Sequence, residues 1–143
     1  MKITSKPVEK TYKIASDPDG TLEVTIRQAS FGETTKLREL SSQSRIVDSG
    51  EDSVAVEQDV NQNDIKAKSI FLTLSNVDGI FDEENQPIDP LDFVDDGGYR
   101  RIRSEVGFMK VINFWPDAVI DEIYEKVLEV NVNWDNRRNK EGE

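Results

Sequence analysis

The sequence has no histidine and no cysteine among its 143 residues. These two absences exclude a Ser-His-Asp or Cys-His catalytic centre, and they exclude a zinc site made of imidazole or thiolate ligands. They also exclude disulfide bonds, which agrees with a reducing compartment. The catalytic options that remain are carboxylate chemistry, lysine chemistry and the binding of hard cations by oxygen ligands.

Long hydrophobic runs are missing as well. No apolar stretch approaches the roughly 18 residues that a membrane-spanning helix requires. Residues 1–10 are charged and lack an apolar centre, so they do not have the pattern of a secretory signal peptide. We therefore expect a soluble, cytoplasmic protein with no membrane partner, and its length fits one domain.

Positive charge is scarce in the middle of the chain. Residues 46–98 carry 2 basic and 14 acidic groups, a net charge of −12, whereas residues 1–45 carry +2 and residues 99–143 carry −1. The phosphate backbones of nucleic acids repel such a centre, so we expect no nucleic-acid binding. The acidic charge either keeps the chain soluble or attracts a basic protein.

The N-terminal part has the pattern of a β-hairpin. Residues 11–16 and 21–27 are rich in β-prone side chains that alternate with polar ones. Between them lies Asp17-Pro-Asp-Gly20, which is a strong turn signal. This segment lacks the later ligands of an EF-hand loop, so the sequence favours a plain turn over a calcium site.

A helix is predicted over residues 30–46. Ser30 and Glu33 have the spacing of a capping box, and Leu37 and Leu40 are expected to face the core. Basic residues near this helix could be read as a nucleic-acid patch, but no aromatic residue interleaves with them for base stacking. We interpret them as solvated, and they are Arg27, Lys36, Arg38 and Arg45.

The middle of the chain is predicted to be irregular, with short strands at 53–57 and 70–74. A helix is the alternative for 70–74, because the preceding Ala67 and Lys68 favour one. Residues 78–90 predict a second hairpin or an ordered loop. Its carboxylates could imitate a magnesium site, but metal ligands normally converge from several elements, so we expect no metal and no cofactor. These carboxylates are Asp78, Asp82, Glu83 and Glu84.

The C-terminal part predicts two helices, 102–114 and 117–130, separated by Trp115-Pro116. The first is expected to bury Val106, Ile112 and either Met109 or Phe108. The second has a wide apolar face at helical spacing, and most such faces are core. This face consists of Val119, Ile120, Ile123, Tyr124, Val127 and Leu128.

Together these patterns predict a single α+β domain over residues 1–134. An N-terminal β-hairpin and short strands with a helix are followed by a C-terminal helical pair. We expect most strands before residue 77 and the longest helix within 103–131. Residues 135–143 contain no apolar side chain and are predicted to be a disordered tail.

Three stretches resemble the tail assembly chaperones of long-tailed, siphovirus-type bacteriophages. They are the hairpin ending in Glu23-Val-Thr-Ile-Arg-Gln-Ala29, the acidic centre with its apolar run 70–74, and the segment 114–131 that leads to Trp134. Similar proteins tend to have proline where this chain has Val132. The resemblance implies a small helper in the host cytoplasm that binds the helical tape-measure protein, keeps it soluble and recruits tail-tube subunits.

The resemblance makes the C-terminal third the expected partner-binding surface. Trp115 and Trp134 are the better interface candidates, because each lies at the end of an element and tryptophan is enriched in binding hot spots. Self-association is left open. The expected partner-binding residues are Trp115, Ile120, Ile123, Tyr124, Val127 and Trp134.

Other classes of function stay open. One is a structural tail or head–tail joining component, which would persist in the virion. Another is an acidic DNA-mimic inhibitor, although the carboxylates crowd into one loop-rich region. An enzyme that uses Asp95 and Asp96 is disfavoured, because adjacent residues on a strand point apart.

Overall fold

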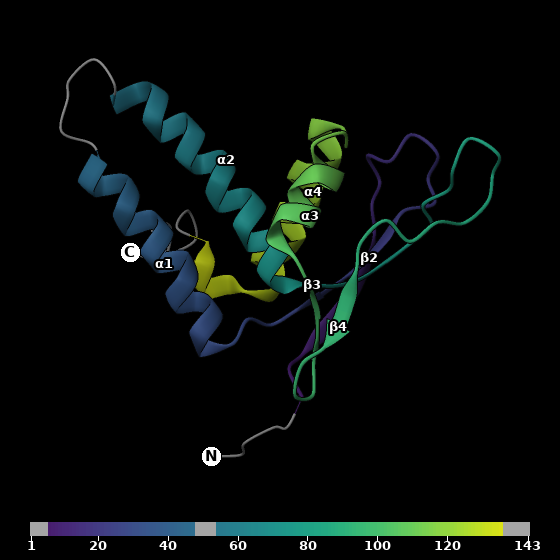
Figure 1. Ribbon diagram of the computed structural model, residues 1–143, viewed down its shortest axis with the longest axis horizontal. Coiled ribbons are helices and arrows are strands. Elements are labelled where there is room, and N and C mark those ends of the chain that lie inside the picture. The colour runs from purple at the N-terminus through teal and green to yellow at the C-terminus, as the bar shows by residue number, and fades with distance from the viewer. Residues whose placement is uncertain (1–5, 48–53, 136–143) are drawn as a thin grey trace.

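The computed structural model describes residues 6–47 and 54–135, and the side chains of 41–47 and 54–61 are left out of the description. These residues form an α+β fold in which a twisted antiparallel sheet packs against helices (Figure 1). The elements in chain order are β1 (Glu9–Lys13), β2 (Glu23–Arg27), α1 (Phe31–Val47), α2 (Val54–Thr73), β3 (Leu74–Asp78), β4 (Phe93–Asp95), β5 (Arg100–Ile102), α3 (Glu105–Ile112), α4 (Asp117–Val130) and the short 3-10 helix η1 (Val132–Trp134).

The predicted N-terminal hairpin is confirmed. β1 and β2 pair antiparallel, and β2 also pairs with β3, so that the sheet order is β1-β2-β3. The turn is held by the carboxylate of Asp17, which accepts the N–H groups of Thr21 and Leu22 at 2.8 and 2.9 Å. Gly20 ends the turn with φ +69°, a backbone conformation that glycine adopts without strain.

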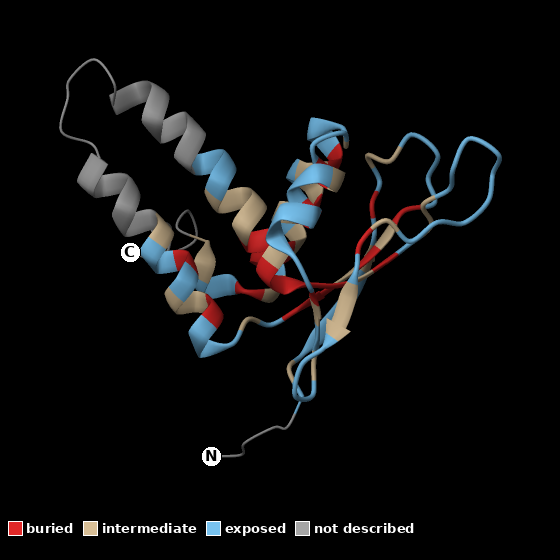
Figure 2. Cartoon of the chain, in the orientation of Figure 1, coloured by how far each residue is buried: buried red, intermediate tan, exposed pale blue. Residues whose placement is uncertain are grey.

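The core lies where the sheet meets the C-terminal helices (Figure 2). Alternate residues of β2 point inward, and α4 lies against β2 with its predicted apolar stripe. Side chains no more than 2% exposed come from seven elements or their flanks. They include Ile14, Val24, Ile26, Ile70, Leu74, Ile102, Phe108, Ile123 and Val127.

α1 begins at the predicted capping box. The N–H of Glu33 donates to Ser30 Oγ at 3.2 Å, and the N–H of Ser30 donates to Glu33 Oε1 at 2.9 Å. The same carboxylate also binds Arg27, which is only 1% exposed. The interpretation of Arg27 as a solvated residue was therefore wrong, because its guanidinium joins α1 to the interior of the sheet.

The strand predictions for 53–57 and 70–74 were wrong. Residues 54–57 and 70–73 belong to α2, and Leu74 is the first residue of β3. Hydroxyl groups fit this helix because Ser69 Oγ and Thr73 Oγ1 donate to carbonyls one turn back, at 2.6 and 2.7 Å. The end of α2 contacts α3, α4 and β5, so consecutive residues there are buried. The sequence therefore lacks the alternation of apolar and polar residues that marks a helix with one exposed face.

One further prediction about element placement was wrong. α2, with 20 residues, is longer than α4, with 14, so the longest described helix does not lie within 103–131. Three of the five described strands, β1, β2 and β3, begin before residue 77 as expected, and β4 and β5 form an antiparallel hairpin after it. The segment 79–92 between β3 and β4 is an ordered loop with one isolated bridge, Phe81 to Pro87.

The C-terminal helical pair is confirmed, and α4 spans the predicted range 117–130. α3 is shorter than predicted, because Ser104 caps its N-terminus and accepts the N–H of Gly107 at 3.1 Å. Phe108 and Ile112 are buried as expected. Val106 and Met109 are 67% and 43% exposed, so the expectation that Val106 is buried was wrong.

α4 is attached to the hairpin by polar contacts at both ends. Near its start, Glu122 accepts the N–H groups of Ala15 and Ser16, each at 2.8 Å. Burial tends to raise the pKa of Glu122, but these hydrogen bonds and nearby Lys126 outweigh it, so the pKa is lowered. Past its end, Asn131 accepts the N–H of Ala29 at 2.7 Å. Apart from Asp135, the predicted tail 135–143 lies outside the described residues.

Candidate partner-binding groove

Two carboxylates of the acidic segment 78–90 accept hydrogen bonds from groups close to them in the sequence. Within the described ranges, no three histidine, cysteine or carboxylate side chains are placed to hold a metal ion. Asp82 instead shapes the loop, since its Oδ1 accepts the N–H groups of Glu84 and Gln86 at 2.9 Å each. Asp78 accepts a hydrogen bond from the side chain of Asn76 at 3.0 Å. These contacts agree with the interpretation of the segment as an ordered loop.

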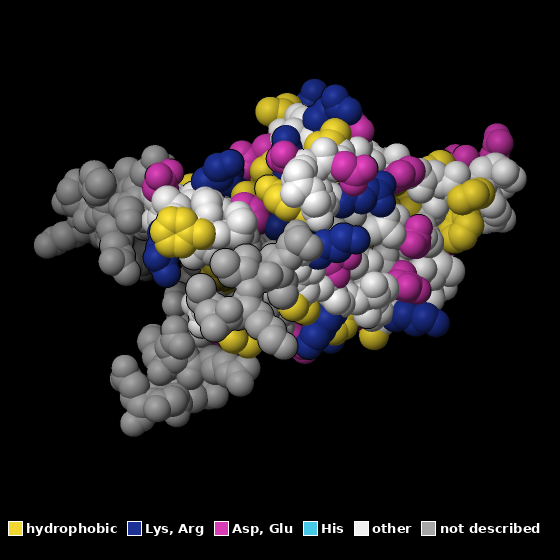
Figure 3. Space-filling model, turned by 90° about the horizontal axis from the view of Figure 1, so that it is seen from below, with side chains coloured by type: hydrophobic (Ala, Val, Ile, Leu, Met, Phe, Trp, Pro, Cys, Tyr) yellow, Lys and Arg dark blue, Asp and Glu magenta, His cyan; other side chains and the backbone are white. Residues whose placement is uncertain are grey.

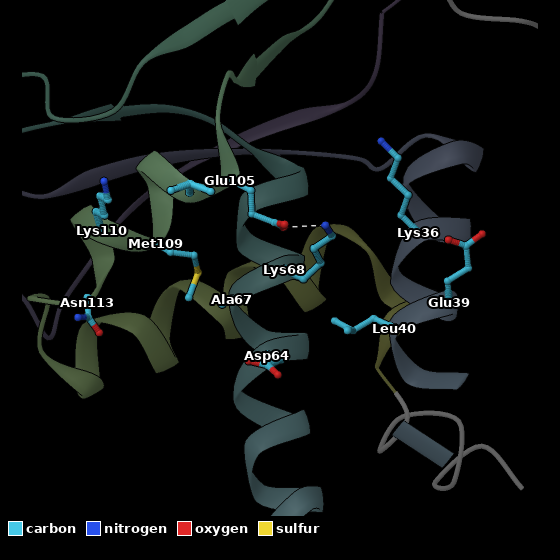
Figure 4. Close-up of a pocket in the computed structure, with 11 residues that line it drawn as sticks. Lys36, Glu39, Leu40, Asp64, Ala67, Lys68, Glu105, Met109, Lys110 and Asn113 are labelled. Carbon is cyan, nitrogen blue, oxygen red and sulfur yellow. Dashed lines mark hydrogen bonds and ion pairs between the residues drawn. The ribbon is translucent and has the colours of Figure 1, made fainter. Parts of the chain in front are cut away.

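An open groove lies between three helices and has a volume of about 760 Å³ (Figure 4). α1 and α2 run side by side, and α3 flanks α2 on its other side. The residues that line the groove are Lys36, Glu39 and Leu40 from α1, Asp64, Ala67 and Lys68 from α2, and Glu105, Val106, Met109, Lys110 and Asn113 from α3 and its C-cap.

The middle of the groove is apolar. Leu40 and Met109 extend toward α2 from its two sides, and Ala67 lies on α2 between them (Figure 4). The small side chain of Ala67 leaves room for the backbone of a bound helix to approach α2 closely. Val106 adds a second exposed apolar side chain from α3, one turn before Met109. Exposed apolar surface of this kind, enclosed by polar residues, is typical of an interaction site.

The rim of the groove carries both signs of charge. Lys68 on α2 and Glu105 on α3 form an ion pair with a nitrogen–oxygen distance of 2.6 Å, drawn as the dashed line in Figure 4. Both side chains are partly exposed, so the pair contributes no more than about 1 kcal/mol to folding. Three lysines and three carboxylates line the groove, and together they give it no net charge. The rim residues are Lys36, Lys68, Lys110, Glu39, Asp64 and Glu105.

The groove is lined by none of the six residues that the sequence analysis expected to bind a partner. Ile123 and Val127 are 0% exposed and belong to the core, so in this conformation they cannot contact a second protein. Ile120 and Tyr124 are half-buried and pack against the same core. The apolar face of α4 is therefore mainly internal.

The two tryptophans differ from each other in their surroundings. Trp134 packs against the core, and its Nε1 donates to Thr34 Oγ1 at 3.3 Å, so it fastens η1 to α1. Trp134 is thus a structural contact as well as a candidate interface residue. Trp115 is half-buried at the corner between α3 and α4, beside a small cleft separate from the groove.

Sequence reasoning missed the groove residues on α3, although a signal for them exists. The short helix α3 has five large apolar residues, which is more than a single inward face can bury. Phe108 and Ile112 take the inward positions and Val111 is half-buried, so Val106 and Met109 are left outside. An excess of apolar residues over one helical face could have indicated a binding surface.

Among the described helices, none is long and apolar enough to cross a membrane. Comparison of the chain with protein-family models, with curated proteins and with solved structures found no match.

Proposed function

We propose that this protein is a tail assembly chaperone that binds an apolar, helical segment of a phage tape-measure protein in the groove between α1, α2 and α3. The observation that carries the proposal is the groove itself, an open channel of about 760 Å³ with an apolar middle and a charged rim. The resemblance of the sequence to tail assembly chaperones supports this choice of partner. Recruitment of tail-tube subunits is the second part of the proposed role.

The form of the groove favours a helix as its occupant. Amphipathic helices bind in apolar grooves through residues spaced three or four apart, and Val106 and Met109 offer contacts at that spacing. The rim has no net charge, so a partner helix with mixed charges on its flanks fits it. A tape-measure protein is long and helical, and a chaperone needs many modest contacts of this kind rather than one tight site.

The charge of the chain supports a solubilising role. The formal net charge is −11, and the groove residues contribute none of it, so the excess acid lies outside the groove. A complex with an apolar partner would keep this charge on its surface, and like charges oppose the association of one complex with another. The groove can therefore cover apolar surface of the partner while the rest of the chain keeps the complex dispersed.

The test is co-expression with the tape-measure protein, followed by titration of a purified tape-measure fragment. Val106→Lys places a charge in the groove, and its matched control is Val8→Lys, since these two valines are 67% and 57% exposed. We expect wild type and Val8→Lys to move the tape-measure protein from pellet to supernatant. Val106→Lys is expected to weaken binding about tenfold or more, which corresponds to about 1.4 kcal/mol.

Circular dichroism must show that each variant is folded. Equal binding by folded Val106→Lys and Val8→Lys would remove the groove from the interface. A wild-type protein that leaves the tape-measure protein insoluble would contradict the chaperone proposal as a whole.

A further inference from the structure

A second cleft lies where the β1–β2 turn, the start of the loop 79–92 and the corner between α3 and α4 meet. Its volume is about 160 Å³, and it shares no lining residue with the groove. Val119 and Leu22 are buried side chains of its wall, whereas Phe81 is 47% exposed. The apolar residues of the cleft are Leu22, Ile80, Phe81, Trp115, Pro116 and Val119.

The wall of this cleft is held in place by contacts between its two loops. Thr21 Oγ1 donates to the carbonyl of Gly79 at 2.7 Å. Gly79 has φ +84°, and a Cβ at this position would lie 1.8 Å from the carbonyl oxygen of Thr21, so only glycine allows the two loops to approach so closely. A cleft that is already formed binds with little cost of ordering.

The size of the cleft suits one large apolar side chain. A protein cavity of about 150 Å³ lined by apolar residues is able to hold a benzene molecule, and this cleft has a similar volume. The aromatic rings of Phe81 and Trp115 offer faces for an aromatic or aliphatic side chain. The expected anchor is therefore a single phenylalanine, leucine or similar residue.

The acidic charge around the cleft favours a partner in which basic residues flank this apolar side chain. Residues 14–26 and 69–99 contain no lysine or arginine, and the loop 79–92 alone contains five carboxylates. Two more carboxylates, Asp17 and Asp19, line the cleft itself. At the end of the molecule formed by these loops, on the right in Figure 3, hydrophobic and acidic side chains are visible without basic ones. This pattern complements a positively charged partner.

We infer that this cleft is a docking site for a basic protein segment, in which one apolar side chain enters between Phe81 and Trp115 while flanking lysines or arginines face the carboxylates of the two loops. The site is distinct from the proposed groove, so the protein could hold two partners at once. The inference does not depend on the identity of the partner in the groove.

Three synthetic peptides test the inference by isothermal titration against the full chain. The probe is Lys-Arg-Gly-Phe-Gly-Arg-Lys, and its controls replace phenylalanine with alanine or all four basic residues with glutamate. We expect the probe to bind about tenfold or more tightly than the alanine peptide, the effect of burying one phenylalanine side chain. Binding should weaken as salt rises from about 0.05 to 0.5 M, because salt screens exposed charges.

Variants of the chain locate the bound peptide. Phe81→Ala should weaken probe binding about tenfold or more, whereas Phe31→Ala, which removes an aromatic side chain 87% exposed at the start of α1, should leave binding unchanged. The groove variant Val106→Lys should also leave it unchanged, so that failure of the proposed function and failure of this site can be told apart.

A matched pair of charge variants completes the test. Asp19→Lys with Glu84→Lys reverses one exposed charge that lines the cleft and one in the loop 79–92 that forms part of its wall. Glu9→Lys with Glu39→Lys makes the same change of net charge elsewhere. We expect only the first pair to abolish probe binding. The inference is overturned if the probe does not bind at about 1 mM, if the alanine peptide binds equally well, or if the two charge pairs weaken binding equally.

Discussion

Glu33 is 7% exposed and its carboxylate faces the guanidinium of Arg27, and we predict that Glu33→Ala destabilises the protein by about 3–5 kcal/mol. The reason lies in what remains after the carboxylate is removed. Arg27 donates from Nη1 to Glu33 Oε1 at 2.6 Å, and its Cζ lies 4.3 Å from the centre of the Tyr99 ring. The ring and neighbouring carbonyls are neutral, so the variant contains a buried charge without a counter-charge.

The loss also includes the helix cap, which moves the estimate toward its upper end. The Glu33 carboxylate accepts the N–H of Ser30 at 2.9 Å, and loss of a cap costs about 1 kcal/mol. A loss of about 3–5 kcal/mol is a fifth or more of the stability of a typical domain, about 5–15 kcal/mol. It should lower the melting temperature by about 10 °C or more.

The assay is urea unfolding followed by far-ultraviolet circular dichroism, with wild type and variant compared at equal m-value. Glu39→Ala is the matched control, because Glu39 is an exposed glutamate of the same helix, and it should change stability by no more than about 0.5 kcal/mol. In the double variant Arg27→Met with Glu33→Leu the stranded charge is gone, so it should be at least about 1 kcal/mol more stable than Glu33→Ala. A loss below about 1 kcal/mol in Glu33→Ala would refute the reasoning.

Three further predictions concern loops and polar contacts. Gly79→Ala should destabilise the protein much more than Gly97→Ala does, because a Cβ at Gly79 meets a backbone oxygen whereas one at Gly97 meets no atom within 4 Å. Equal melting temperatures of the two variants would contradict this prediction. Asn131→Ala should cost about 1–3 kcal/mol in urea unfolding, since the buried amide bonds three backbone groups, and a neutral effect would mean that water replaces them. The pKa of Glu122 is lowered in the folded protein, so the ionised carboxylate stabilises the fold at pH values above 4.5, the ordinary pKa of this group. This stability is lost as the pH falls through the pKa of the folded state. The advantage of wild type over Glu122→Gln, measured by unfolding at pH 7 and pH 3, should therefore shrink at the lower pH.

Local patterns were sufficient wherever a few neighbouring residues form the structure. The turn 17–20 depends on an aspartate that bonds N–H groups of its own segment, and the capping box depends on Ser30 and Glu33 three residues apart. The helix 117–130 was predicted at its observed bounds, because one of its faces is apolar and the other polar. In each case the residues that stabilise the element are close together in the sequence.

The same local reasoning failed where an element is surrounded. The end of α2 contacts α3, α4 and β5, so the run 70–74 is apolar on every side and resembles a buried strand. Arginine is a residue type that is mostly found at the surface, but the side chain of Arg27 is enclosed by Glu33, the carbonyl of Leu72 and the ring of Tyr99. Neither environment can be inferred from residue type, because each depends on partners from distant parts of the chain, such as Leu72 and Tyr99 for Arg27.

The candidate site depends on tertiary structure even more strongly. The amino-acid sequence by itself determined that histidine and thiol chemistry are excluded, that the centre of the chain is acidic, and where the hairpin and the last helix lie. Only the tertiary structure decided that Leu40, Ala67 and Met109 face one groove and that the apolar face of α4 is buried in the core. The physical reason is that periodicity and capping act over one or two turns, whereas a groove is formed by the packing of helices whose contacting residues are tens of positions apart.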